Sequence, residues 1–206
     1  GAAFPLATEA EWEDQVETGR GWSYGAEVLL RRTRGATTGW LSYTLSWTRR
    51  QFDALNDGEP FPFRYDRRHD FTATATHQLT GVTSVSATWA YRSGTALTLP
   101  EARYRAPELG PRESLADGYF NPFGSVKSYG ERNGYRMRDY HRLDLGLTFK
   151  WGDPSGFHAL EIGAYNAYNR KNPYFLRTDR ASNGALQGET ISLLPTVPYL
   201  NYRFRF

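Results

Sequence analysis

The sequence predicts an all-β protein, an antiparallel barrel whose strands span a membrane. Three observations lead to this fold class. Seven segments alternate between apolar and polar residues with the period of two that is typical of strands. Short turns and long connections alternate between these segments. Aromatic residues make up 16% of the chain although the mean hydropathy is -0.65, as expected for strands with one face toward lipid and one toward water.

Six of the predicted strands precede the final one, and the second shows the pattern best. Leu41, Tyr43 and Leu45 alternate there with Ser42 and Thr44, so the two kinds of side chain point to opposite faces. About ten residues that rise about 3.3 Å each span an apolar band about 25 Å high when the strand is tilted by about 45°. The six strands cover, in order, residues 22–34, 41–48, 70–79, 84–92, 142–151 and 157–169.

The seventh strand, residues 200–206, gives the strongest argument for a membrane. Burying its arginines in a dry core would be costly, and exposing its rings to water would leave a large apolar patch. A barrel with a lipid-facing exterior and a wet interior avoids both costs. The two faces of this strand are Leu200, Tyr202, Phe204 and Phe206 on one side and Asn201, Arg203 and Arg205 on the other.

The connections between the strands fall into two length classes. Short turns rich in glycine, threonine and serine alternate with long loops, which is the layout of an outer-membrane barrel with short periplasmic turns and long extracellular loops. We therefore expect the two classes at opposite ends of the strands. The turns are residues 35–39, 80–83 and 152–156, and the loops are residues 52–68, 94–139 and 170–190.

Seven strands are an odd number, whereas bacterial single-chain barrels have an even number. Residues 1–20 alternate poorly and are rich in acidic residues, so we interpret them as the remnant of an extracellular loop. We expect residues 1–206 to form the C-terminal portion of a larger barrel. No run of about eighteen apolar residues predicts a transmembrane helix.

Five segments carry a resemblance to a known family. They read GWSYGAEVLL at residues 21–30, FRYDRRHDF at 63–71, YHRLDL at 140–145, AYNAYNRKNPY at 164–174, and PYL at 198–200 with the terminal Phe206. In this order they resemble late strands of the TonB-dependent outer-membrane transporters. The resemblance covers residues 21–206.

The resemblance implies an architecture and a set of partners. Such transporters have a barrel of about 22 strands that is filled by a plug domain, and this chain contains neither the plug nor the segment that contacts the energy-coupling complex. The implied partners are outer-membrane lipid, the remaining barrel and plug, the TonB complex, the barrel-assembly machinery, which would recognise Phe206, and a surface lipoprotein. The implied location is the outer membrane of a Gram-negative cell.

Rings and guanidinium groups interleave in the long loops, where we expect ligand binding. Rings stack on sugars or planar chelates, and arginines hold carboxylates or an anionic ferric complex. The alternative is that the rings only pack the loops together. The candidate residues are Arg103, Tyr104, Arg105, Tyr119, Phe120 and Tyr135 in the longest loop, and Phe61, Phe63 and Tyr65 in the loop before it.

Other residues give little support to an enzyme, a metal or a cofactor. The chain has no cysteine, and His69, His77, His141 and His158 do not have the spacing of metal ligands. The string from Gly21 to Gly25 matches the G-x-S-x-G of a hydrolase, but that motif needs a helix after the serine, and a strand follows Ser23.

Glu27 and Glu161 are expected to be solvated or paired with arginines rather than catalytic. The net charge of +3 is scattered, so nucleic acid is not an expected partner.

These observations favour one function and leave two alternatives. We expect the barrel portion of an energised importer for a scarce bulky ligand, such as a ferric siderophore, a cobalamin or an oligosaccharide. An independent eight-stranded outer-membrane barrel, acting as an adhesin or an acyl hydrolase, is the first alternative and needs an eighth strand in residues 1–20. A soluble ligand-binding barrel with its apolar face inward is the second.

Overall fold

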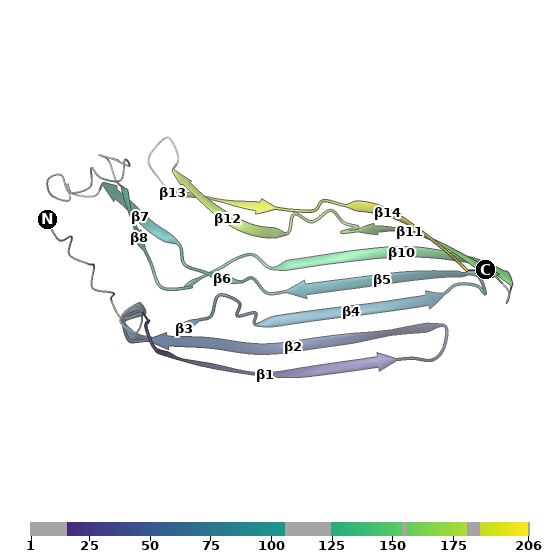
Figure 1. Ribbon diagram of the computed structural model, residues 1–206, viewed down its shortest axis with the longest axis horizontal. Coiled ribbons are helices and arrows are strands. Elements are labelled where there is room, and N and C mark those ends of the chain that lie inside the picture. Colours follow the sequence, from purple (N-terminus) through teal and green to yellow (C-terminus); the bar gives the residue numbers. More distant parts are fainter. Residues whose placement is uncertain (1–15, 106–124, 154–155, 181–185, 206) are drawn as a thin grey trace, which may run out of the picture.

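The fold is dominated by one antiparallel sheet of seven long strands, seen in a computed structural model (Figure 1). The structure describes residues 16–105, 125–153, 156–180 and 186–205. Neighbours in the sheet are also neighbours among the seven long strands, so the sheet is a simple meander. All seven predicted strands are confirmed, as β1 (Gly19–Arg32), β2 (Thr37–Phe52), β4 (His69–Gln78), β5 (Thr83–Arg92), β10 (Tyr140–Asp153), β11 (Gly156–Tyr165) and β14 (Val197–Arg205).

The strand register joins the predicted apolar faces into one. Residues that lie directly opposite each other on paired strands point to the same side of the sheet. Apolar residues face apolar residues in this way across most of every strand pair, and one row runs Leu30, Leu41, Ala73, Trp89, Leu143. The predicted assignment to faces is therefore confirmed for the paired residues of each strand, while Phe206 lies outside the described residues. We call the two sides of the sheet the apolar face and the polar face.

The apolar face is not covered by a second layer within the described residues. Leu30 is 61% exposed, Leu200 70% and Tyr202 51%. A sheet in a water-soluble domain normally buries one face against another sheet or against helices. The buried hydrophobic side chains of the described residues are few and mostly small: Phe61, Ala90, Ala96 and Ala159.

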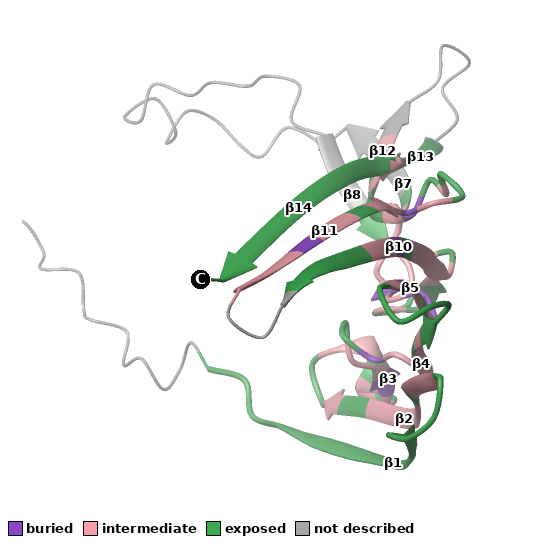
Figure 2. Ribbon diagram, turned by 90° about the vertical axis from the view of Figure 1, so that its right-hand side faces the viewer, coloured by how far each residue is buried: buried purple, intermediate pink, exposed green. Residues whose placement is uncertain are grey.

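The sheet is open and curved. Figure 2 shows it bending as an arc from β1 to β14, and these two strands form its edges without pairing to each other. The chain is thus all-β with antiparallel sheets, and this arrangement is compatible with a piece of a barrel. In the parts of the chain that the structure describes, we find no helix with the length and apolar character needed to cross a membrane.

The two length classes of connection lie at opposite ends of the strands, as predicted (Figure 1). The β1–β2, β4–β5 and β10–β11 turns share one end with the end of β14. In the β1–β2 turn Gly35 has φ 94°, a left-handed conformation that glycine adopts without steric cost. We call this the short-turn end and the opposite one the long-connection end.

The long connections contain regular structure that the sequence prediction missed. Residues 94–139 and 170–190 were predicted as plain loops. In the described residues the former contains two antiparallel strand pairs and the latter contains one, and these pairs extend beyond the end of the sheet (Figure 1). Some of their strands have only two residues, and the longer ones do not alternate cleanly between apolar and polar residues. They are β6 (Ala96–Leu97), β7 (Pro100–Arg105), β8 (Ser125–Tyr129), β9 (Tyr135–Arg136), β12 (Pro173–Arg180) and β13 (Leu186–Ser192), and the first connection adds β3 (Phe61–Pro62) and a 3-10 turn at Asn56–Gly58.

Several predicted boundaries need correction: β2 begins at residue 37 and ends at 52 rather than at 41 and 48, and β14 begins at 197 rather than at 200. The sixth strand was predicted to continue to residue 169, but β11 ends at Tyr165 because Asn166 takes a left-handed backbone with φ 52°. Residues 1–20 were predicted as a loop, whereas β1 already begins at Gly19. Residues 1–15 lie outside the described residues.

Candidate functional site

The polar face carries a cluster of arginines and tyrosines near the long-connection end. On β5, Arg92 forms an ion pair of 3.0 Å with Asp70 of β4, and its guanidinium lies 5.9 Å from the ring centroid of Tyr140 on β10. Arg92 is opposite both of these residues in the register, so all three point to the polar face. The arginine therefore has one carboxylate partner and one ring beside it.

A second arginine repeats this arrangement one strand further along the sheet. Arg142 of β10 pairs with Asp144 at 2.9 Å, and its guanidinium lies 3.6 Å from the ring centroid of Tyr165 on β11. It also donates hydrogen bonds to the hydroxyls of Tyr140, at 3.0 Å, and of Tyr165. Arginine stacked on a tyrosine face gains a cation–π attraction and stays fixed in place. The guanidinium is thus presented to the polar face in one orientation.

A third arginine approaches the cluster from the connection before β4. Burial lowers the pKa of the Arg67 guanidinium from its ordinary value, and the positive charge of Arg92 lowers it further, while Asp70 and Tyr140 act in the opposite direction. Arginine remains charged at neutral pH despite such a shift. We call Arg67, Asp70, Arg92, Tyr140, Arg142, Asp144 and Tyr165 the arginine–tyrosine cluster. Its formal charge is positive, since it holds three arginines and two aspartates.

The buried carboxylate of Asp66 joins two of the long connections. Asp66 is 2% exposed and accepts a hydrogen bond of 2.7 Å from the backbone N–H of Thr48. It forms ion pairs with Arg136 of β9 and, at 3.6 Å, with Arg68. A buried carboxylate is stable only when it is paired in this way. Arg136 also donates to the carbonyl of Gly94 at 3.1 Å, so it fixes the start of the next connection.

Asp139 extends this polar layer toward the third connection. Its carboxylate accepts a hydrogen bond of 2.7 Å from the Tyr91 hydroxyl and one of 3.1 Å from the Gly94 N–H. Arg170 of the third connection donates to the Asp139 carbonyl at 3.0 Å. All three long connections are therefore tied together above the arginine–tyrosine cluster.

The third connection is anchored by a buried amide. Asn166 is 1% exposed and donates through Nδ2 to the carbonyls of Arg170 and Leu194, at 3.0 Å each. Its backbone N–H donates to Asp144 at 2.9 Å, so the anchor touches the arginine–tyrosine cluster directly. Asn166 and Asn169 both have a left-handed backbone, which asparagine tolerates better than most residues.

The structure describes the side chains of four of the nine predicted ligand-binding residues. Tyr65 is 67% exposed and lies 5.3 Å, centroid to centroid and edge to face, from Phe63, whose ring has Arg50 over it at 3.8 Å. Tyr135 of β9 is 41% exposed. Phe61 is 5% exposed and stacks on Phe52 at 6.2 Å, which fits the packing alternative.

For the other five predicted ligand-binding residues, the structure describes either the backbone alone or neither backbone nor side chain. Arg103, Tyr104 and Arg105 belong to β7, whose partner is β8. Tyr119, Phe120 and the predicted assembly signal Phe206 lie outside the described residues. Binding by this set of residues stays a prediction.

The four histidines lie on the apolar face rather than in a cluster. Each is opposite an apolar or aromatic residue in the register, His69 and His141 toward the long-connection end and His77 and His158 toward the short-turn end. Within the described part of the chain, no three histidine, aspartate or glutamate side chains are placed to hold a metal ion. Each histidine Nδ1 instead shares a hydrogen bond with a hydroxyl: Tyr43 at 2.9 Å, Tyr168 at 2.7 Å, Thr37 at 2.7 Å and Tyr202 at 2.7 Å.

Sequence reasoning missed Arg67, Tyr140 and Tyr165 as members of a site. The available signal for Arg67 and Tyr140 was their position just before the polar-face residues Asp70 and Arg142. Tyr165 gave no such signal, because its contact with Arg142 depends on the pairing of β10 with β11. Comparison with known proteins finds no matching family, no matching curated protein and no matching solved structure. The function proposed below therefore rests on the geometry and chemistry of this chain.

Proposed function

We propose that this chain supplies seven strands of the barrel of an outer-membrane importer of the TonB-dependent class. The observation that carries the proposal is the continuous apolar face, which crosses all six strand pairs and is opposed by a polar face. Lipid would cover the apolar face, and the polar face would line a wet interior. Because β1 and β14 are both unpaired edges of an open sheet, further strands would complete the barrel.

The apolar face favours a membrane over water. Monomeric soluble proteins rarely expose a contiguous apolar patch of more than a few hundred Å², yet large side chains such as Leu30, Ile162 and Leu200 are each about half exposed or more. A soluble sandwich would place a second sheet there. Lipid provides the same cover without a second layer.

The difference between the two ends of the sheet supports an orientation. Short periplasmic turns and long extracellular connections are typical of outer-membrane barrels, so the long-connection end would face the exterior. The arginine–tyrosine cluster would then lie on the inner wall, just below the outer mouth. Its positive charge and its rings suit an anionic ligand with planar groups, such as a ferric siderophore. Cobalamin or an oligosaccharide is the alternative cargo, and no covalent chemistry is needed.

The membrane assignment is tested by arginine substitution at matched depth on the two faces. Leu145→Arg would place a charge in the middle of the apolar face at a cost of about 2–4 kcal/mol, whereas Ser42→Arg would place it in the wet interior. We expect Leu145→Arg to reduce the amount of heat-modifiable protein in the outer-membrane fraction severalfold and Ser42→Arg to leave it nearly unchanged. Equal effects at the two positions would contradict the proposal.

Ligand binding is tested at Arg67, which has no carboxylate within ion-pair distance among the described residues. Arg67→Gln in the complete transporter should weaken binding of an anionic ligand about tenfold, the effect of losing one charge-assisted hydrogen bond. Arg34→Gln removes an arginine at the short-turn end and is the matched control. Unchanged binding in Arg67→Gln, measured by titration of the purified transporter, would remove the cluster from the ligand path.

A further inference from the structure

A groove crosses the apolar face near the short-turn end, away from the arginine–tyrosine cluster. Its floor is a row of the smallest residues of three neighbouring strands, Gly39 of β2, Ala75 of β4 and Ala87 of β5, which lie directly opposite one another. The groove is shallow and open to the outside, and it has a volume of about 480 Å³. Three small side chains in a row leave a channel where larger residues would form a level surface.

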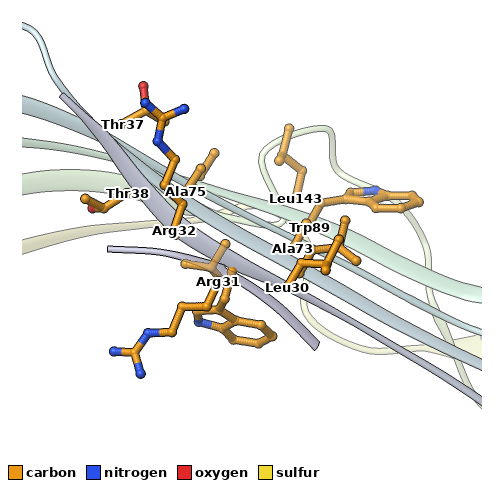
Figure 3. Close-up of a pocket in the computed structure, with 14 residues that line it drawn as sticks. Leu30, Arg31, Arg32, Thr37, Thr38, Ala73, Ala75, Trp89 and Leu143 are labelled. Carbon is orange, nitrogen blue, oxygen red and sulfur yellow. The ribbon is translucent and has the colours of Figure 1, made fainter. Parts of the chain in front are cut away.

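Large side chains form the wall on the side toward the long-connection end. Leu30 and Leu41 stand on one side of Ala73, and Trp89 and Leu143 stand on the other, all in one row of the register. Figure 3 shows Leu30, Trp89 and Leu143 on the same side of the strands around Ala73. The lining of the groove is therefore hydrocarbon and indole along most of its length.

One end of the floor is closed by a cation. Arg32 lies opposite Gly39 in the register, so it is the apolar-face residue at the end of the Gly39–Ala75–Ala87 row. Its Nε donates to the carbonyl of Arg34 at 3.2 Å, which turns the side chain back along the turn. Figure 3 shows its guanidinium next to Thr37, while Arg31 points the other way. Among the described residues, no carboxylate forms an ion pair with Arg32.

The charge around the groove has one sign. On the groove side, β1 ends at Arg32 and Arg34 follows it in the first turn, and the sequence has no acidic residue between Glu27 and Asp53. A basic rim next to an apolar channel complements a molecule with a negative head and a hydrocarbon tail. Anionic lipid headgroups attract basic residues that lie at the membrane surface.

We propose that this groove binds an anionic glycerophospholipid, with one acyl chain along the Gly39–Ala75–Ala87 floor and the phosphate at Arg32. The inference rests on the proposed membrane location of the apolar face. The short-turn end would lie in the periplasmic leaflet, so the lipid would come from that leaflet. The Thr37 hydroxyl, which shares a hydrogen bond with His77, lies beside the Arg32 guanidinium and adds a polar contact for the headgroup.

The test uses the complete transporter, purified in detergent and stripped of lipid. Native mass spectrometry would follow binding of palmitoyl-oleoyl phosphatidylglycerol and of the phosphatidylcholine with the same chains. We expect one phosphatidylglycerol molecule to stay bound tightly and phosphatidylcholine to bind more weakly. Arg32→Gln should weaken the binding of phosphatidylglycerol about fivefold, which is the contribution of one arginine near an anionic surface. It should also remove the preference for phosphatidylglycerol over phosphatidylcholine. Arg31→Gln, on the opposite face, is the matched control and should change neither.

A second pair of variants tests the floor. Ala87→Leu fills the channel and should abolish retention of the lipid, whereas Ala164→Leu adds the same side chain to the apolar face outside the groove and should not. Heat-modifiability shows whether each variant folds, and Arg32→Gln remains as a test if Ala87→Leu does not.

Three outcomes would overturn the inference: equal binding of the two lipids to the unchanged protein, equal loss in Ala87→Leu and Ala164→Leu, or a dimer seated on this face in place of lipid. These outcomes are distinct from failure of the proposed function. A protein that leaves the membrane without detergent would contradict the membrane location itself. A folded and inserted barrel that shows no preference for phosphatidylglycerol would contradict only the lipid site.

Discussion

The two ends of the sheet are built by different means from the same strands. At the short-turn end, neighbouring strands reverse direction within a few residues, and backbone hydrogen bonds such as Leu79 N–H to Thr83 O close the turn locally. At the long-connection end, Asp66 pairs with Arg136, which is 70 residues away in the sequence. The comparison teaches that local sequence shapes one end, whereas the other end depends on buried polar contacts between distant segments.

The buried carboxylate at the long-connection end should give the largest effect on stability. Asp66→Ala would remove the carboxylate that accepts from Arg136 and from the Thr48 N–H. Hydrogen bonds to a charged group contribute about 1.5–3 kcal/mol each. We expect faster amide hydrogen exchange at Thr48 and a lower free energy of unfolding in a denaturant titration in detergent. Asp53→Ala removes an exposed carboxylate from the same connection and is the control. A loss below about 1 kcal/mol would mean that the connections are not held together through Asp66.

The short-turn end should respond to backbone conformation instead. Gly35 has φ 94°, so Gly35→Ala should cost about 1–2 kcal/mol of stability for an L side chain in a left-handed conformation. Gly81 lies in the next turn of this end, and a Cβ added there meets nothing within 4 Å. Gly81→Ala should be neutral or should stabilise by about 0.4–1 kcal/mol. Denaturant titration of both variants measures the difference, and equal effects would contradict the turn geometry.

The sequence predicted the locally determined features well and the contacts between distant segments poorly. Period-two alternation is a local signal, so residues such as Leu41 to Trp47 and Leu143 to Trp151 predicted both the strands and their apolar faces correctly. The lengths of the connections also predicted which ends of the strands lie together. These features depend on residues within one strand or one turn.

The candidate site could be predicted only in part. Arg142 and Asp144 were correctly assigned to a polar strand face, but nothing in their spacing shows that Tyr165 lies under the arginine, because that contact depends on the register between β10 and β11. Asp66 gave no signal either, since its partner Arg136 belongs to another connection. A buried ion pair between distant segments has no sequence period.

The smallest expected effect comes from an exposed ion pair at the long-connection end, which contrasts with the buried contacts of Asp66 at the same end. Arg177 of β12 and Glu189 of β13 form an ion pair of 2.6 Å, but their side chains are 56% and 60% exposed. Exposed pairs contribute about 0.2–1 kcal/mol, because water and salt screen them. A double-mutant cycle of Arg177→Ala, Glu189→Ala and the double variant isolates this pair from other contacts of Arg177. The coupling energy should fall further as salt is raised to about 1 M, where the Debye length is about 3 Å. A coupling energy above about 2 kcal/mol that does not fall with salt would mean that another part of the complete protein covers the β12–β13 hairpin. The Arg177–Glu189 pair would then be a buried contact of this end, as Asp66 is.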